Sequence, residues 1–415
     1  MLDKLLNFFI IAMSVMAFSS RGEKDEPQPK PDPEPQGPVE RTVLVYMVAD
    51  NNLGTQNGLN RADLKEMQTG AAEGQLNGGR LLVYHNRPGT VSSSPTTPNN
   101  PPLLLEVTPT GIDTLKTYPD DPTIYSVEVD RMREVLADMK TYAPADDYGL
   151  VFWGHATGWM THGEDDIAIP GVAPKKRSYG YDRTKWMTLG SMAEALRDEK
   201  FSFIYFDVCL MGTVEVAYEL RHITPYIVAS PTELEGEGMP YHLNLGSFFA
   251  SGEPDVVGMA TNTFEYYNAR SGYSCQMVVI DTSALDNLAD VSREVFATQT
   301  DFPARLWFVQ ELSKTHRRFF GGNDSCTDCH PVYDMESYFD VLTSSRPDLM
   351  VKWQNALDAT VKYKATTARD FTGISIGHYC GLGSYVVRLA DHGDYHGYTY
   401  TSWWKDVVST APVVN

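Results

Sequence analysis

Short apolar runs of strand length recur in this chain, and segments with the helical spacing of apolar residues separate them. Runs of about 4–8 apolar residues without polar alternation are typical of strands that are buried on both faces of a sheet. Strands that alternate with helices favour an α/β fold, in which helices cover both faces of a mostly parallel sheet. The predicted strands are 42–49, 81–84, 103–107, 148–153, 203–206 and 226–229, and the predicted helices are 60–72, 127–139, 189–196 and 213–222.

The pattern becomes less regular beyond about residue 250. Because 415 residues exceed one compact core of ordinary size, we expect two domains or one enlarged α/β domain. We assign a core to 41–250 and an α+β portion to 251–415, which packs on the core and completes it. In that portion the sequence predicts a strand at 277–280, helices near 285–320 and 336–364, and strands near 373–377 and 384–389.

The N-terminus has the layout of a secretory signal. Lys4 precedes an apolar stretch that reaches Phe18, and small residues follow, so we predict a signal peptide at 1–19. The stretch is too short to favour a lasting membrane span. Residues 20–40 are rich in proline and charge and should form an extended tether. We therefore expect export to the periplasm, the cell surface or the medium. A lipid anchor is not expected, because residues 1–40 contain no cysteine.

Acidic residues outnumber basic ones by 54 to 34, which gives a formal net charge of −20. This balance argues against nucleic acid as a partner, because phosphate binding needs a basic face. It is compatible with the attraction of cationic peptides, and a solvated acidic surface explains it as well. We expect a monomer.

The chain has five cysteines, namely Cys209, Cys275, Cys326, Cys329 and Cys380. An odd number in an exported chain leaves at least one thiol unpaired unless two molecules are linked. Five in 415 residues is too few for a disulfide scaffold. The question is therefore which cysteine is free, and why.

Two candidate catalytic residues, His155 and Cys209, each lie just past the C-terminal end of a predicted buried strand. In an open α/β sheet, catalytic side chains collect at this edge. A helix predicted directly after Cys209 would favour its thiolate, and a nearby imidazole can activate the thiol. The spacing of 209 − 155 = 54 residues is similar to the separation of about 50 in caspases. Taken singly, each could instead be a structural residue, a buried cysteine or a loop histidine.

Four ordered motifs carry a resemblance to a known family. They are Tyr-Met-Val-Ala-Asp-Asn-Asn-Leu at 46–53, Gly-His-Ala-Thr-Gly-Trp at 154–159, Asp-Val-Cys-Leu-Met at 207–211, and the segment from Ala-Ser at 229–230 to Met-Pro-Tyr at 239–241. On these motifs the chain resembles the clostripain family of cysteine peptidases, which is related to gingipains, legumains and caspases. The order and spacing hold over 42–241, with weaker likeness beyond.

The resemblance implies a caspase-like three-layer sandwich and an endopeptidase that cleaves peptides or proteins after Arg or Lys. It implies His155 and Cys209 as the catalytic pair, with the N–H groups of Cys209 and Ala156 binding the oxyanion. Ala156 stands where the family has glycine. The substrate-binding residues that it implies are Asp207, Glu237, Ser230 and Thr232. Asp207 could alternatively cap a helix, and Glu237 could be a solvated loop acid.

Family members are often made as inactive precursors that are cut between the histidine and the cysteine. Here that segment contains Lys175, Lys176 and Arg177, which suits a self-cleaving enzyme and equally an exposed basic patch. The departures from the family motifs leave a second reading open. In that reading the chain is a degraded relative on the cell envelope that binds peptides or partners without cleaving them.

Cofactors are not expected, and no metal site is assigned. The resemblance raises calcium dependence, yet no segment matches an EF-hand loop. Cys326, Cys329 and His330 fit the attachment pattern of c-type haem. We favour a local disulfide or a metal-binding pair there over haem, because no second axial ligand is evident nearby.

Overall fold

The computed structural model describes residues 37–89, 100–119, 121, 123–160, 178–301, 308–314, 331–387 and 397–412. The chain from Gln36 onward forms one compact unit. The signal peptide predicted at 1–19 and the tether as far as residue 36 lie outside the described residues.

Within the described residues, a nine-stranded sheet runs in the order β13-β10-β9-β8-β5-β1-β2-β3-β4. The strands from β9 to β2 pair in parallel, and antiparallel strands extend both edges. The α/β fold with a mostly parallel centre is thus confirmed. The strands are β1 (Val39–Val48), β2 (Arg80–Asn86), β3 (Leu103–Thr108), β4 (Gly111–Thr117), β5 (Ala145–Trp153), β8 (Phe203–Asp207), β9 (Tyr226–Ala229), β10 (Gln276–Asp281) and β13 (Val361–Thr366).

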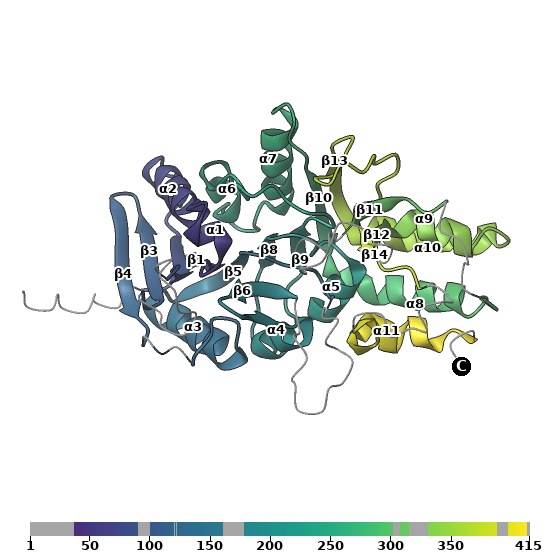
Figure 1. The fold of residues 1–415 in the computed structure, drawn as a ribbon, viewed down its shortest axis with the longest axis horizontal. Helices are drawn as coiled ribbons and strands as arrows, with labels where there is room; N and C mark the ends of the chain where they lie inside the picture. The colour runs from purple at the N-terminus through teal and green to yellow at the C-terminus, as the bar shows by residue number, and fades with distance from the viewer. Residues whose placement is uncertain are drawn as a thin grey trace, which may run out of the picture. The chain divides into compact units, whose positions relative to one another are not determined.

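Helices cover both faces of this sheet, as Figure 1 shows. One face carries α2 (Leu59–Ala72), α6 (Tyr241–Phe248) and α7 (Val256–Asn268). The opposite face carries α3 (Val129–Tyr142), α4 (Leu189–Leu196), α5 (Val214–Leu220) and α8 (Leu285–Phe296).

Strand β1 shows why its sequence is continuously apolar. Val45 and Met47 belong to the hydrophobic cluster on one face, and Tyr46 and Val48 belong to the cluster on the other. All four side chains are fully buried. Each contributes about 1.5–3 kcal/mol by leaving water, so the two layers of helices are held to the sheet through its central strands.

The remaining elements lie around this core. A small sheet joins β11 (Glu311–Lys314), β12 (Pro331–Asp334) and β14 (Gly383–Ser384), and β6 (Tyr179–Asp182) pairs with β7 (Lys185–Met187). The other α-helices are α1 (Asn52–Thr55), α9 (Met335–Leu342), α10 (Pro347–Thr360) and α11 (Ser402–Asp406), and short 3-10 helices span Thr282–Ala284, Tyr398–Tyr400 and Val408–Thr410.

Four expectations for the C-terminal portion were wrong, and one of them is the strand near 384–389: of its described residues only Ser384, in β14, lies in a strand. The helix predicted near 336–364 ends at Thr360, and β13 follows it, because the edge of β10 offers hydrogen bonds to an antiparallel partner. Residues 311–314 form a strand where a helix was predicted near 285–320. Residues 373–377 form no strand and contribute only an isolated bridge between Arg369 and Ser375.

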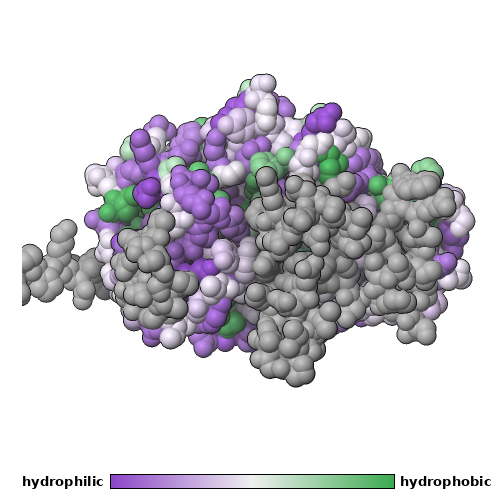
Figure 2. All heavy atoms as spheres, in the orientation of Figure 1, coloured by the Kyte–Doolittle hydropathy of each residue, from purple (hydrophilic) through white to green (hydrophobic). Residues whose placement is uncertain are grey.

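Within the described ranges, none of the helices combines the length and the apolar character that a membrane span requires. On the face drawn in Figure 2, the coloured residues are mostly hydrophilic, and the apolar ones form small separate patches.

Candidate active site

Strand register brings the two predicted catalytic residues to neighbouring positions. Trp153, the last residue of β5, pairs with Asp207, the last residue of β8, and the two strands are parallel. His155 and Cys209 each follow by two residues. The loops that carry them are in contact, because a Cβ at Gly158 would lie only 2.7 Å from the Leu210 carbonyl oxygen. The sheet therefore places the imidazole loop beside the thiol loop at one edge.

The His155 loop is held by hydrogen bonds from the β6 segment. The Gly180 N–H donates to the His155 carbonyl (2.8 Å), and the Thr157 N–H donates to the Ser178 carbonyl (2.9 Å). Gly154 has a φ of 140°, which a residue with a side chain rarely adopts. This backbone turns the chain sharply out of β5 and directs His155 toward the start of α1.

The imidazole of His155 is bonded to Asn52, the first residue of α1. Its Nε2 lies 2.8 Å from the Asn52 Oδ1. With the carbonyl oxygen as acceptor, Nε2 carries the proton and Nδ1 is the basic nitrogen. Burial lowers the pKa of His155 to about 4. The resting imidazole is therefore neutral at pH 7 and can accept a proton.

The Cys209 loop is braced on both sides. The Leu210 N–H donates to the Thr232 carbonyl (2.9 Å), and the Gly212 N–H donates to the Ser230 carbonyl (2.8 Å). From the other side, the Gly383 N–H donates to the Gly212 carbonyl (2.9 Å). Leu210 has a φ of 66°, a left-handed conformation that costs a non-glycine residue energy and that these contacts maintain.

The Cys209 thiol is free and half-buried, and its Sγ accepts a hydrogen bond from the Leu234 N–H (3.3 Å). Burial, followed by the charge of Glu233, raises its pKa to about 12. The expectation that an adjacent helix favours the thiolate was wrong. Helix α5 begins at Val214, close to its predicted start at residue 213, but desolvation of the thiol has the larger effect on its pKa. The resting pair is thus a thiol and a neutral imidazole.

The predicted oxyanion donors lie on these two loops. Ala156 faces Tyr179 in an isolated antiparallel bridge. The hydrogen bonds that close this bridge use the N–H groups of Thr157 and Gly180 and not that of Ala156. The side chain of Ala156 is buried in the core, with an exposed fraction of 7%. Its methyl group therefore packs inward, where it adds to the core.

Asp207 is buried at the end of β8, and α5 is capped at Thr213, so Asp207 is not the cap of that helix. Its carboxylate accepts from the Met239 N–H (2.7 Å) and the Tyr241 hydroxyl (3.0 Å). Burial raises the pKa of Asp207 to about 7. The group is therefore a partly ionised buried acid two residues before the thiol.

A second buried acid, Asp63 of α2, was not predicted. It accepts a hydrogen bond from the Trp153 indole at 2.5 Å, and Trp153 is the register partner of Asp207. Burial, followed by the charge of Asp207, raises the pKa of Asp63 to about 9. Two carboxyls thus share one desolvated region on the α2 side of the sheet.

The other predicted substrate-binding side chains are engaged within the protein. Glu237 is exposed and forms a bidentate pair with Arg270 (2.6 and 3.0 Å), and it also accepts from the Tyr273 hydroxyl. Ser230 and Thr232 are fully buried, and their hydroxyls lie 3.0 Å apart. In this structure Ser230 and Thr232 hold the loop that braces Cys209, and of the two predicted acids only Asp207 acts electrostatically on the thiol.

Comparison with known proteins identifies the family. A model of the clostripain family, Peptidase_C11, matches residues 45–401. The chain belongs to the clostripain family. The recognition from four motifs is therefore confirmed, and the chain is by family a cysteine peptidase. No curated protein matches the chain.

Solved structures of clostripain-family proteins share this fold. An inactive zymogen C11 protease from Parabacteroides distasonis is 28% identical, with a TM-score of 0.73 over 90% of this chain and 99% of that one. A secreted C11 cysteine protease from Bacteroides thetaiotaomicron, in complex with an irreversible peptide inhibitor, is 25% identical, with a TM-score of 0.70 over 89% of this chain and 99% of that one.

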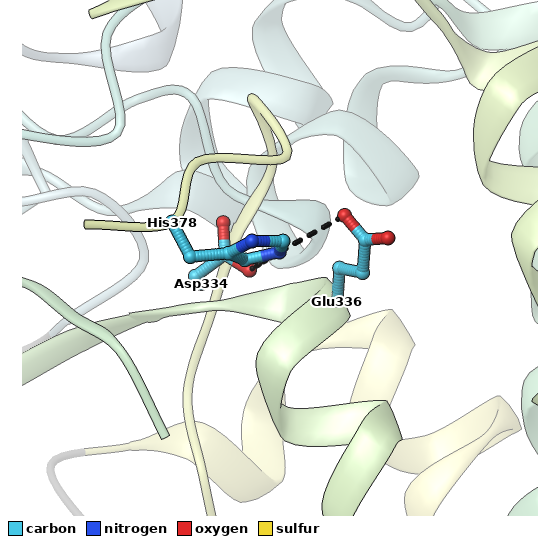
Figure 3. A group of neighbouring side chains, drawn as sticks. All are labelled: Asp334, Glu336 and His378. Carbon is cyan, nitrogen blue, oxygen red and sulfur yellow. Dashed lines mark hydrogen bonds and ion pairs between the residues drawn. The ribbon is translucent and has the colours of Figure 1, made fainter. Parts of the chain in front are cut away.

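Calcium dependence, which the clostripain resemblance raises, stays a prediction. Among the described residues, one group of side chains could hold a metal ion. Asp334, Glu336 and His378 place ligand atoms within 4.8 Å of one another (Figure 3). However, calcium prefers oxygen ligands, and Asp334 already accepts from the N–H groups of Ser337 (2.9 Å) and Cys380 (2.6 Å). With His378 only 3.0 Å from Glu336, the group ties the 378–380 segment to α9.

Several predicted residues lie outside the described part of the chain. They are the processing residues Lys175, Lys176 and Arg177 and the haem-type motif Cys326, Cys329 and His330. Their roles stay predictions.

Proposed function

We propose that this protein is an exported cysteine endopeptidase that cleaves after Arg or Lys through Cys209 and His155. The observation that carries the proposal is the register of β5 with β8, which sets both residues two positions beyond one strand pair. Because β5 and β8 are parallel and end in register, the loops that follow them leave the sheet at the same edge.

The chemistry follows from the neutral resting pair. As the Cys209 sulfur attacks the substrate carbonyl carbon, its proton passes to His155, and the N–H groups of Ala156 and Cys209 bind the oxyanion. The imidazolium then protonates the leaving amine as the peptide bond breaks, which leaves a thioester. Water, which gives a proton to His155, hydrolyses the thioester and restores the thiol.

Preference for a basic side chain is supported by the buried acids near the nucleophile. Asp207 and Asp63 lie on the same face of the sheet, and an entering guanidinium or ammonium would offset their charge in a desolvated setting. Glu237, which Arg270 holds, contributes less than the resemblance implies.

Reporter peptides test both activity and preference. We expect hydrolysis after Arg and Lys and at least about tenfold less after citrulline, the neutral isostere of Arg, because a buried carboxylate discriminates by charge. Cys209→Ala should abolish hydrolysis, whereas Cys275→Ala, which removes another free buried cysteine, should retain it. Hydrolysis by the Cys209→Ala protein, or equal rates for Arg and citrulline, would refute the proposal. Binding of these peptides without cleavage would favour the alternative that the chain is a catalytically inactive relative that binds peptides.

We further propose self-activation by cleavage near Lys175–Arg177. The zymogen state that is described for the Parabacteroides distasonis protein supports it. Purified protein should split near residue 177, as mass spectrometry would show, and Cys209→Ala protein should stay intact. A variant with Gln at 175, 176 and 177 should also stay intact, while still reacting with thiol reagents. Cleavage of the Cys209→Ala protein on its own would point to a contaminating protease.

A further inference from the structure

One acidic residue near Cys209 has a buried carboxyl oxygen without a hydrogen-bond partner among the described residues. Glu233 lies in the loop after β9 with only 4% of its surface exposed. Its Oε1 has no hydrogen-bond partner, and its carboxyl forms no ion pair among the described residues. Buried carboxyls are normally hydrogen-bonded or paired with a cation, because desolvation otherwise disfavours their charge. A partner from outside the protein would resolve this arrangement.

The position of Glu233 links it directly to Cys209. The next residue, Leu234, donates its N–H to the Cys209 Sγ at 3.3 Å. Two acidic groups act on the thiol, Glu233 from this loop and Asp207 from β8. The charge of Asp370 also acts on Glu233. The Asp370 carboxylate accepts hydrogen bonds from the Thr372 hydroxyl (2.6 Å) and the Ile374 N–H (2.6 Å).

We propose that Glu233 binds a cationic group of the peptide substrate and, by doing so, couples substrate binding to the reactivity of Cys209. The inference rests on the proposed function. A negative charge next to a thiol opposes loss of its proton, and a bound cation cancels that charge. A cation is favoured over a neutral donor because Asp370 adds to the negative field around Glu233.

Electrostatics supports this role. Burial, followed by the charge of Asp370, raises the pKa of Glu233 to about 7. Both of its protonation states are therefore populated near neutral pH. A cation that binds there selects the ionised carboxylate and neutralises it, so Cys209 loses a repulsive neighbour when a matching substrate is present.

Alkylation of Cys209 by iodoacetamide measures the coupling without any need for hydrolysis. The midpoint pH of the alkylation rate should fall by about one unit in Glu233→Gln, the size of shift that one nearby charge produces. N-acetyl-arginine amide should lower the wild-type midpoint by a similar amount, and N-acetyl-citrulline amide should not. In Glu233→Gln the arginine probe should cause little further change.

A matched control lies two residues away. Glu235→Gln removes the same charge from the same loop, but the Glu235 carboxylate is held by the N–H and hydroxyl of Ser274 (3.0 and 3.3 Å). Its profile, with and without the probe, should match that of the wild type. Glu233→Asp keeps the charge and should also retain the wild-type midpoint.

Either of two results would overturn the inference. The first is an alkylation midpoint in Glu233→Gln that equals that of the wild type. The second is an equal shift of the midpoint by the arginine probe in the wild type and in Glu233→Gln, which would assign the cation to Asp207. If Glu233→Gln does not fold, Asp207→Asn provides the test. This variant keeps Glu233, so N-acetyl-arginine amide must still lower the midpoint pH of Cys209 alkylation in it. Peptide cleavage is measured separately. If the predicted alkylation shifts occur but no peptide is hydrolysed, the Glu233 inference holds and the proposed peptidase function is refuted.

Discussion

Asn52 and His155 form a pair that neither motif alone reveals. The Asn52 side chain extends from the first residue of α1, and α1 is itself anchored because Asn51 caps it and donates to the carbonyls of Val48 (2.9 Å) and Tyr181 (2.8 Å). A base must point at the proton that it takes, so an imidazole with a fixed tautomer and orientation is more effective than a free one.

Substitution of Asn52 should therefore weaken catalysis more than binding. In Asn52→Ala we expect kcat to fall by about 10- to 100-fold, a part of what positioned acid–base groups contribute, with KM within about twofold of the wild type. Steady-state kinetics on an Arg reporter peptide measures both. Asn57→Ala, an exposed asparagine in the same segment, is the control. An unchanged kcat in Asn52→Ala would mean that His155 needs no orientation by this residue.

For single residues, the sequence indicates candidates for catalysis, but it does not indicate the contacts that surround them. His155 and Cys209 are identifiable because each combines a reactive side chain with a strand end and a motif. Asn52 lies in the motif at 46–53, but the sequence does not indicate that it contacts His155, which is 103 positions away. Asp63 and Glu233 could not be assigned, because burial and missing partners are properties of the packed molecule.

Among the elements, the turn after β8 imposes the tightest steric requirement. A Cβ at Gly212 would lie 2.6 Å from the Pro231 nitrogen and 2.7 Å from the Ser230 carbonyl carbon. Both are backbone atoms, which cannot move aside without shifting the loop that braces Cys209.

Gly212→Ala should therefore displace the nucleophile. We expect a loss of about 1–3 kcal/mol in the free energy of unfolding, as for other overpacked sites, and about a hundredfold loss in kcat/KM. Gly190→Ala is the control, because nothing lies within 4 Å of a Cβ there. That variant should be as stable as the wild type or more so, since alanine favours the helix. Urea denaturation measures the free energy of unfolding, and reporter peptides measure kcat/KM. Equal values for Gly212→Ala and Gly190→Ala would contradict the prediction.

Elements with a clear apolar pattern were predicted within a few residues, whereas polar strands were missed. The predicted α4 and β9 have the observed bounds. Strand β4 has no buried residue, so it presents no apolar run to recognise. Strand β13 alternates Lys and partly buried residues, and only its pairing with β10 distinguishes it from a continuation of α10.

For the molecule as a whole, buried titratable groups set the dependence of stability on pH. Burial raises the pKa of Asp63 to about 9 and those of Asp207, Glu215 and Glu233 to about 7. These acids hold more protons in the folded chain than in the unfolded chain, so their contribution is present at low pH and is lost as the pH rises through 7–9. Buried His85 and His155, with pKa values lowered to about 4, act oppositely, but only below about pH 6.5.

The free energy of unfolding should therefore fall by about 2–5 kcal/mol between pH 6.5 and 9. Urea denaturation at fixed salt over this range measures it. Glu215→Gln should flatten the decline, because Glu215 is fully buried and its Oε1, which accepts from the Tyr385 N–H at 2.9 Å, can be replaced by the amide oxygen. A stability that stays level or rises with pH would show that these acids are ionised in the folded chain without penalty.

The contacts that brace the nucleophile turn from residues 383–385 have a consequence for biosynthesis. The Gly383 N–H donates to the Gly212 carbonyl, and the Tyr385 N–H donates to the Glu215 carboxylate. The segment after Cys209 therefore depends on residues that are synthesised some 170 positions later. Until the ribosome has made residues 383–385, the turn lacks these supports. A nascent chain that ends before residue 385 therefore lacks the contacts that fix the loop of Cys209.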